Sequence, residues 1–128
     1  MRDIYIVGGG PTHGTCKYDR EAWGVNRGIR FSEFWKDGNK LFFFDDVATF
    51  DPNVMTVADL WNAKGIVEYL TTPKNVEYLK KYDIPASVYP LGEITEKFRS
   101  NYFANTICYM VAYAMYEKVD SIGLYGVD

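Results

Sequence analysis

Short hydrophobic runs, separated by polar and glycine-containing turns, recur along most of the chain. Runs of this length, rich in β-branched and aromatic residues, are typical of strands rather than of helices. The run at 40–44 is apolar at consecutive positions after its first residue, as expected of a strand that is buried on both faces. The pattern predicts strands at 3–7, 21–26, 40–44, 84–90 and 121–126.

The hydrophobic period changes after Thr56, where apolar residues recur at mostly helical spacing. That spacing predicts one helix over 56–70, which ends before Pro73. Further helices are predicted at 31–35 with Ser32 as cap, 75–81, 91–99 and 101–119. Strands that alternate with helices form a mostly parallel sheet through right-handed crossovers. We therefore expect one three-layer α/β domain over 1–128, with about five strands and with helices on both faces.

The composition excludes several classes of protein. A chain of 128 residues is long enough for one core and too short for two. Its net charge of −3 and its pI near 5.1 argue against nucleic acid as the partner, because such proteins carry a clustered basic face. No apolar run is long enough for a bilayer, and Asp3 followed by a strand is unlike a signal peptide. We expect a soluble, cytoplasmic protein that does not bind membranes.

The cysteines give no sign of a structural metal or of a disulfide framework. Cys16 and Cys108 are far apart in the sequence and lack metal-ligand spacing. Two reduced thiols are the favoured interpretation.

The first strand runs into a glycine turn, and this turn is the strongest indication of function. Gly8, Gly9 and Gly10 are followed by Pro11 and Thr12. Such a turn can bring backbone N–H groups close to a phosphate without interference from side chains. The spacing differs from the dinucleotide fingerprint, which needs a third glycine where the helix crosses the strand. Phosphate binding and a purely steric turn are therefore both open.

His13 is the only histidine and lies inside this turn. It is the one side chain there that titrates near neutral pH, so it is the candidate catalytic base. A hydrogen bond to a ligand phosphate, or no role at all, is equally compatible with this position.

Polar side chains also follow the second and third predicted strands. In an open α/β sheet, ligands bind outside the carboxyl ends of the strands. Asn26 can bind a base or a ribose and Arg27 a phosphate, although Asn26 equally suits a left-handed turn before Gly28. Asp45 and Asp46 can hold Mg²⁺ against a diphosphate, but loop solvation and helix capping are favoured for this pair. The other strand ends are Tyr89 with Pro90, and Asp128.

The long helix predicted near the carboxyl terminus begins beside the same edge of the sheet. Its unpaired N–H groups make Asn105 and Thr106 candidate ligand contacts. Tyr109, Tyr113 and Tyr116 share one face of this helix. Core packing is the usual explanation for such a face, while a homo-oligomer interface is the alternative, and we expect a homo-oligomer.

Three segments carry a resemblance to known proteins: Gly9-Gly10-Pro11-Thr12, Trp23-Gly24-Val25-Asn26, and the stretch from Asn105-Thr106 to Gly126-Val127-Asp128. They resemble a Rossmann-like group that includes the bacterial sialyltransferases that use a CMP-activated sugar and the pterin-diphosphokinase-like proteins. The chain is more similar to uncharacterised bacteriophage proteins with a Trp-Gly-Val-Asn type second strand and a Tyr-Met-Val-Ala type helix followed by Leu-Tyr-Gly-Val-Asp. The likeness covers nearly the whole chain and implies a Rossmann-like fold.

The resemblance also implies which residues contact a nucleotide. In the sialyltransferases these are the first turn, the Asn after the second strand and a small hydroxyl residue at the start of the late helix. The matching positions here are Gly10, Pro11 and Thr12, then Asn26, then Asn105 or Thr106. Those relatives continue past the Gly-x-Asp strand into elements that supply catalytic side chains. We therefore expect nucleotide binding to be carried over more readily than catalysis.

Three functions remain open. The first is a small, phage-like nucleotide-binding protein that transfers a glycosyl, nucleotidyl or phosphoryl group from a nucleotide or nucleotide sugar, with His13 as base and Asp45 or Asp46 as optional Mg²⁺ ligands. The second is a non-enzymatic binder, in the host cytoplasm if phage-encoded, that sequesters a host signalling nucleotide or a host protein. The third is a structural or assembly component whose glycine turn binds nothing.

Overall fold

Six parallel strands form one sheet in the computed structural model, which describes residues 1–98 and 105–127. Within these residues the strands lie side by side in the order β5-β4-β3-β2-β1-β6. Every neighbouring pair is parallel. Their bounds are β1 (Asp3–Val7), β2 (Ala22–Val25), β3 (Lys40–Phe42), β4 (Glu68–Thr71), β5 (Ser87–Val88) and β6 (Ser121–Tyr125).

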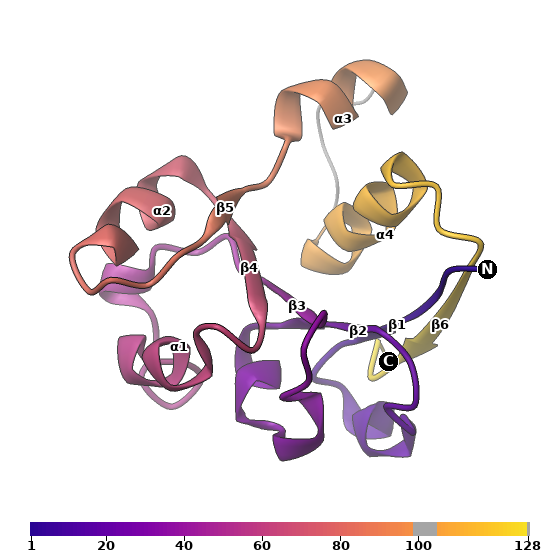
Figure 1. Ribbon diagram of the computed structural model, residues 1–128, viewed down its shortest axis with the longest axis horizontal. Coiled ribbons are helices and arrows are strands. Elements are labelled where there is room, and N and C mark those ends of the chain that lie inside the picture. The colour runs from indigo at the N-terminus through magenta and orange to yellow at the C-terminus, as the bar shows by residue number, and fades with distance from the viewer. Residues whose placement is uncertain (99–104, 128) are drawn as a thin grey trace.

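Helices cover both faces of this sheet, as the sequence predicts (Figure 1). α1 (Val57–Ala63) and α2 (Pro73–Lys80) lie on one face together with four 3₁₀ turns. α3 (Leu91–Phe98) and α4 (Thr106–Tyr116) lie on the other face. From β1 to β5 the chain adds each strand on the same side of the last, and it then crosses back to place β6 beside β1. Right-handed crossovers in two opposite directions put their helices on opposite faces, which produces the three layers.

The two cores follow from the alternation of side chains along the strands. In β3 and just after it, Leu41 and Phe43 point into the core under α1 and α2, whereas Phe42 points into the core under α4. Tyr113 of α4 is only 8% exposed and packs against Trp23 and Phe42, with ring centroids 5.4 and 5.6 Å away. Of the two explanations offered for the tyrosine face of this helix, core packing is the one that applies to Tyr113 within the described chain.

The single helix predicted over 56–70 is wrong, because this segment contains both α1 and β4. α1 ends at Ala63, and Gly65 takes a φ of +84°, which turns the chain away from the helix axis. Tyr69 of β4 is buried and donates a hydrogen bond from its hydroxyl to the carbonyl of Leu60, at 2.6 Å. This strand raises the number in the described sheet to six.

Other elements are shorter than the sequence predicts. β5 occupies two residues of the predicted strand at 84–90, and β3 ends at Phe42. The predicted helix at 31–35 is a 3₁₀ turn, Ser32–Phe34, in which Ser32 is not the cap. α4 begins at Thr106. Residues 99–104, which include the end of the helix predicted at 91–99 and the start of the helix predicted at 101–119, lie outside the described residues. In the described part of the chain, no helix reaches the length and apolarity that crossing a membrane requires.

Candidate functional site

The carboxyl edge of the sheet is the place where the topology favours a ligand site. β2 and β6 lie on opposite sides of β1, so the order of connection reverses there. Chains that leave neighbouring strands in opposite directions open a crevice at such a point. The turns after β1, β2 and β3, where the sequence places most candidate residues, all lie on this edge.

The glycine turn after β1 uses two of its N–H groups inside the protein. Gly8 donates to the carbonyl of Tyr125 at 2.8 Å, and Gly10 donates to the carbonyl of Gly126 at 2.7 Å. The hydroxyl of Thr12 accepts from the N–H of Gly126 at 2.9 Å. The turn after β1 is thus tied to the turn after β6. Gly9 is exposed, and a Cβ atom on it would have no heavy atom within 4 Å.

His13 faces a small hollow on the α1 and α2 face. Pro11–Thr15 forms a 3₁₀ turn, which directs the imidazole onto Phe31, with ring centroids 4.4 Å apart and planes at 9°. Its Nδ1 lies 3.0 Å from the carbonyl oxygen of Gly10. The hollow has a volume of about 200 Å³ and includes Cys16. Burial raises the pKa of the Cys16 thiol, so the thiolate that a nucleophile needs is disfavoured.

Asn26 lines a different and larger hollow of about 500 Å³, together with both acidic candidates, Asp45 and Asp46. Its φ is +46°, in the left-handed region that asparagine tolerates. The carboxamide oxygen, Oδ1, is buried and has no hydrogen-bond partner, and it is the one such side-chain atom in the described part of the chain. The structure therefore brings together three candidates from two strand ends, and His13 is not among the residues that line this hollow.

Asp46 already has partners. Its carboxylate caps the 3₁₀ turn Val47–Thr49 by accepting from the N–H of Ala48 at 3.1 Å, and it accepts from the ammonium of Lys74 at 2.8 Å. The hydrogen bond from Lys74 holds the pKa of this carboxyl below its usual range. This is the capping role that the sequence favours. Among residues 1–98 and 105–127, no group of three His, Cys, Asp or Glu side chains is placed to hold a metal ion.

Asn75 of α2 holds together the segments at the carboxyl edge, a role that the sequence does not predict. The side chain is fully buried. Its Nδ2 donates to the carbonyl of Asp45 at 2.8 Å and to the hydroxyl of Thr71 at 2.9 Å, while its Oδ1 accepts from the N–H of Val47 at 3.0 Å. One amide thus joins α2, β4 and the turn after β3. Asparagine in a first helical turn is common, so only the tertiary structure distinguishes this one.

The arginines that follow β2 hold the loop at 51–55. Arg27 is exposed and reaches the carbonyl of Asn53 at 3.3 Å. Arg30 pairs with Asp59 at 2.9 Å and donates to the carbonyl of Asn53 at 2.8 Å. Residues of this loop line the hollow of Asn26, so both arginines support one of its walls.

The start of α4 lies near the glycine turn, as expected. Asn105 caps the helix by accepting from the N–H of Cys108 at 3.1 Å, and Thr106 is its first residue. A Cβ atom on Gly8 would lie 3.5 Å from Cδ1 of Ile107. Asn105 therefore has a structural role at the edge where a ligand contact is predicted. Asp128, the remaining candidate, lies outside the described residues.

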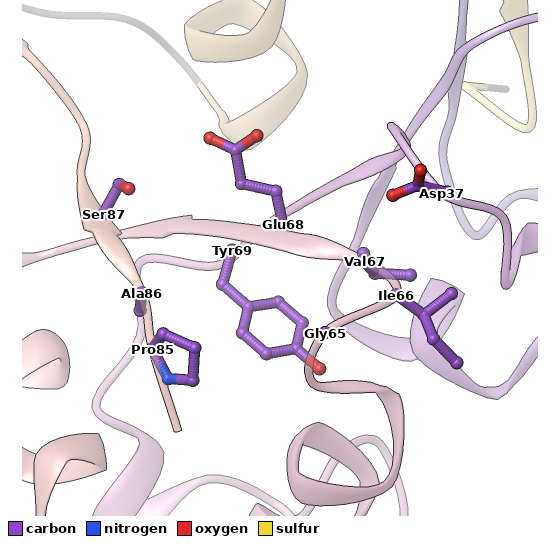
Figure 2. A pocket seen from close by; sticks show the side chains of 9 residues that line it. All are labelled: Asp37, Gly65, Ile66, Val67, Glu68, Tyr69, Pro85, Ala86 and Ser87. Atoms are coloured by element: carbon purple, nitrogen blue, oxygen red, sulfur yellow. The ribbon is translucent and has the colours of Figure 1, made fainter. Parts of the chain in front are cut away.

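A further hollow, of about 300 Å³, opens at the opposite, amino edge of the sheet (Figure 2). Figure 2 shows Glu68 and Tyr69 on opposite sides of β4. The carboxylate of Glu68 pairs with the ammonium of Lys40 at 2.8 Å. None of the residues that the sequence singles out lines this hollow. It lies away from the strand ends where α/β sheets bind ligands.

Comparison with protein-family models, with curated proteins and with solved structures found no match to this chain. The resemblance to phage Rossmann-like proteins and to CMP-sugar sialyltransferases therefore remains a prediction, and the case for function rests on the geometry of the carboxyl edge.

Proposed function

We propose that the protein binds a nucleotide or a nucleotide-activated metabolite across the carboxyl ends of β1 and β2. The observation that carries this proposal is the buried, unpartnered carboxamide oxygen of Asn26. A buried acceptor without a hydrogen bond costs about 1 to 3 kcal/mol. Rotation of the Asn26 side chain would bring this oxygen to the hollow, where a ligand N–H or O–H donor removes the cost. Nucleobase amines and ribose hydroxyls are such donors.

The charges around Asn26 indicate which end of the nucleotide lies there. Asp45, Asp46 and Asp51 all line the hollow, so a phosphate would be repelled. Carboxylates readily accept hydrogen bonds from sugar hydroxyls or base amines. The base and sugar therefore belong beside Asn26, and the phosphate belongs toward Gly9. β1 and β2 are neighbours, and neighbouring strands are about 4.8 Å apart, so one ligand can span both turns.

The same geometry favours binding without group transfer. His13, the candidate base, lines the hollow beside Phe31, which shares no residue with the hollow of Asn26. Asp46 is already paired with Lys74. The second hypothesis from the sequence, a non-enzymatic binder of a signalling nucleotide, is therefore favoured over the transferase.

Thermal unfolding against nucleotides, nucleotide sugars and cyclic oligonucleotides, with and without Mg²⁺, tests the proposal. A ligand at about 100 times its Kd stabilises the fold by about 2.7 kcal/mol, which is easily detected. We expect stabilisation by at least one of these compounds, with the ligand recovered intact by chromatography. Recovery of a product would instead support the transferase, and no stabilisation across the panel would overturn nucleotide binding.

Variants of Asn26 locate the site. Asn26→Gly removes the amide and keeps the left-handed backbone, so we expect the free protein to remain folded and to lose the ligand-induced stabilisation. Asn62→Ala, an exposed asparagine on α1, is the matched control and should respond to the ligand as wild type does. Equal stabilisation of both variants would show that the ligand binds elsewhere.

A further inference from the structure

A second hollow at the carboxyl edge, of about 220 Å³, has aromatic walls. Phe44 follows β3, Tyr89 follows β5, and Tyr109 lies in the first turns of α4, so three separate elements supply the rings. We call it the aromatic hollow. It shares no residue with the hollow of Asn26. Phe44 and Asp45 are consecutive and line different hollows, which places the chain after β3 between the two sites.

The three rings hold one another in fixed orientations. Phe44 packs edge-on against Tyr89 at 5.2 Å and 87°, and Tyr89 packs edge-on against Tyr109 at 5.7 Å and 85°. Phe44 and Tyr109 are tilted at 51°, with centroids 5.1 Å apart. These are favourable geometries for aromatic pairs. The hydroxyl of Tyr89 donates to the carbonyl of Tyr109 at 2.7 Å, which fixes α4 against the end of β5. The walls are therefore formed before a ligand arrives.

The polar atoms at the base of the hollow already have partners. The hydroxyl of Thr71 donates to the carbonyl of Phe43 and accepts from the amide of Asn75. The hydroxyl of Thr72 accepts from the N–H of Asn75 at 3.2 Å. Every described residue that lines the hollow is uncharged. A charged ligand group would lose hydration there without gaining a counter-ion, which weakens its binding.

We propose that the aromatic hollow binds an uncharged, planar aromatic ring of phenyl to indole size, at a site separate from the proposed nucleotide site. An apolar cavity of about 150 Å³ in another protein binds benzene, so 220 Å³ is ample for one ring or for two fused rings. A flat guest can stack on Phe44 or Tyr109 and meet the edge of the third ring. The acidic hollow of Asn26, in contrast, suits polar groups. The edge therefore carries two neighbouring sites of opposite chemistry.

Titrations with three compounds of equal size test this: benzyl alcohol, benzoate and benzylamine. Signals of the methyl groups of Leu91 and Thr71, which line the hollow, are followed by ¹H–¹³C NMR. We expect saturable shifts with benzyl alcohol, and binding at least about tenfold weaker for both charged analogues. Equal affinity for a charged analogue, or the absence of saturable shifts at these two residues, would overturn the proposal.

A blocking variant and a matched control assign the shifts to the hollow. Leu91→Trp places an indole into the aromatic hollow. Leu124→Trp places an indole on β6, the edge strand at the opposite end of the sheet from β5. The two leucines are similarly exposed, at 48% and 51%. Leu91→Trp should weaken benzyl alcohol binding at least about tenfold while Leu124→Trp leaves it unchanged. Retained affinity for benzyl alcohol in Leu91→Trp would overturn the assignment of the binding site to the aromatic hollow. If this variant does not fold, the NMR shifts of the wild-type protein still test the assignment.

Discussion

Gly8 and Gly126 approach so closely that neither position has room for a side chain. A Cβ atom on Gly8 would lie 2.4 Å from the carbonyl oxygen of Gly126, and a Cβ atom on Gly126 would lie 2.3 Å from the carbonyl oxygen of Gly8. The turn after the first strand and the turn after the last strand thus pack backbone against backbone. Gly8 of the glycine run is needed for this contact, and Gly10 holds the same two turns together through its hydrogen bond to the carbonyl of Gly126.

Gly126→Ala is expected to destabilise the protein by about 2 to 4 kcal/mol. The new methyl group meets backbone atoms, and Gly126 has a φ of +66°, which costs a residue with a Cβ about 1 to 2 kcal/mol by itself. Urea unfolding measures the change. Gly9→Ala is the control and should shift stability by less than about 1 kcal/mol, since its Cβ meets no atom within 4 Å. Similar losses in both variants would contradict the contact as the cause.

Asn75→Ala is expected to cost about 3 kcal/mol or more. It removes three hydrogen bonds and leaves the buried N–H of Val47 without its acceptor. Asn62→Ala, on the exposed surface of α1, should change the free energy of unfolding by less than about 0.5 kcal/mol. If denaturant unfolding gave equal values for the two variants, the buried amide would not be what joins α2 to the carboxyl edge.

His13→Ala is expected to weaken the fold by about 1 kcal/mol and to leave nucleotide affinity unchanged. The substitution removes the stack on Phe31 and the contact with the carbonyl of Gly10, both of which lie outside the hollow of Asn26. His13→Phe keeps a ring on Phe31 and should recover much of the stability. Calorimetric titration with the ligand found in the nucleotide panel measures the affinity. A loss of affinity in both variants would place His13 in the binding site.

Stability is expected to fall as the pH rises above about 10. Burial raises the pKa of Tyr18 to about 12, and burial also raises the pKa values of Tyr69, Tyr89 and Tyr113. Below about pH 10 both folded and unfolded chains keep these protons, so the full stability is present. Above it the unfolded chain releases protons that the folded chain retains, and the free energy of unfolding declines until the folded pKa is passed.

Urea midpoints measured from about pH 8 to about pH 11 record this decline. Tyr18→Phe should make the decline shallower. The variant lacks the Tyr18 hydroxyl, whose proton the unfolded chain releases and the folded chain retains in this pH range. A slope that is identical in Tyr18→Phe and wild type would show that Tyr18 does not contribute.

The sequence pattern at the strand ends predicts that Asn26, Asp45 and Asp46 lie at one edge, and they do line one hollow. It could not separate His13 from them, because the direction of that side chain depends on a 3₁₀ turn and on Phe31. It also missed β4, since the apolar residues after Thr56 satisfy a helical period although the second half of the segment pairs with β3 and β5.

The sequence by itself determined most of the strands, the parallel α/β class and the helices on both faces, because hydrophobic period and glycine turns are local properties of the chain. Only the tertiary structure decided the order of the strands, the contact between Gly8 and Gly126 and the buried bridge made by Asn75. These depend on residues that are distant along the chain and meet only when β6 returns to β1 and α2 packs against the sheet. The orphaned oxygen of Asn26 belongs to the same class, because whether a polar atom is buried without a partner is decided by everything that folds around it.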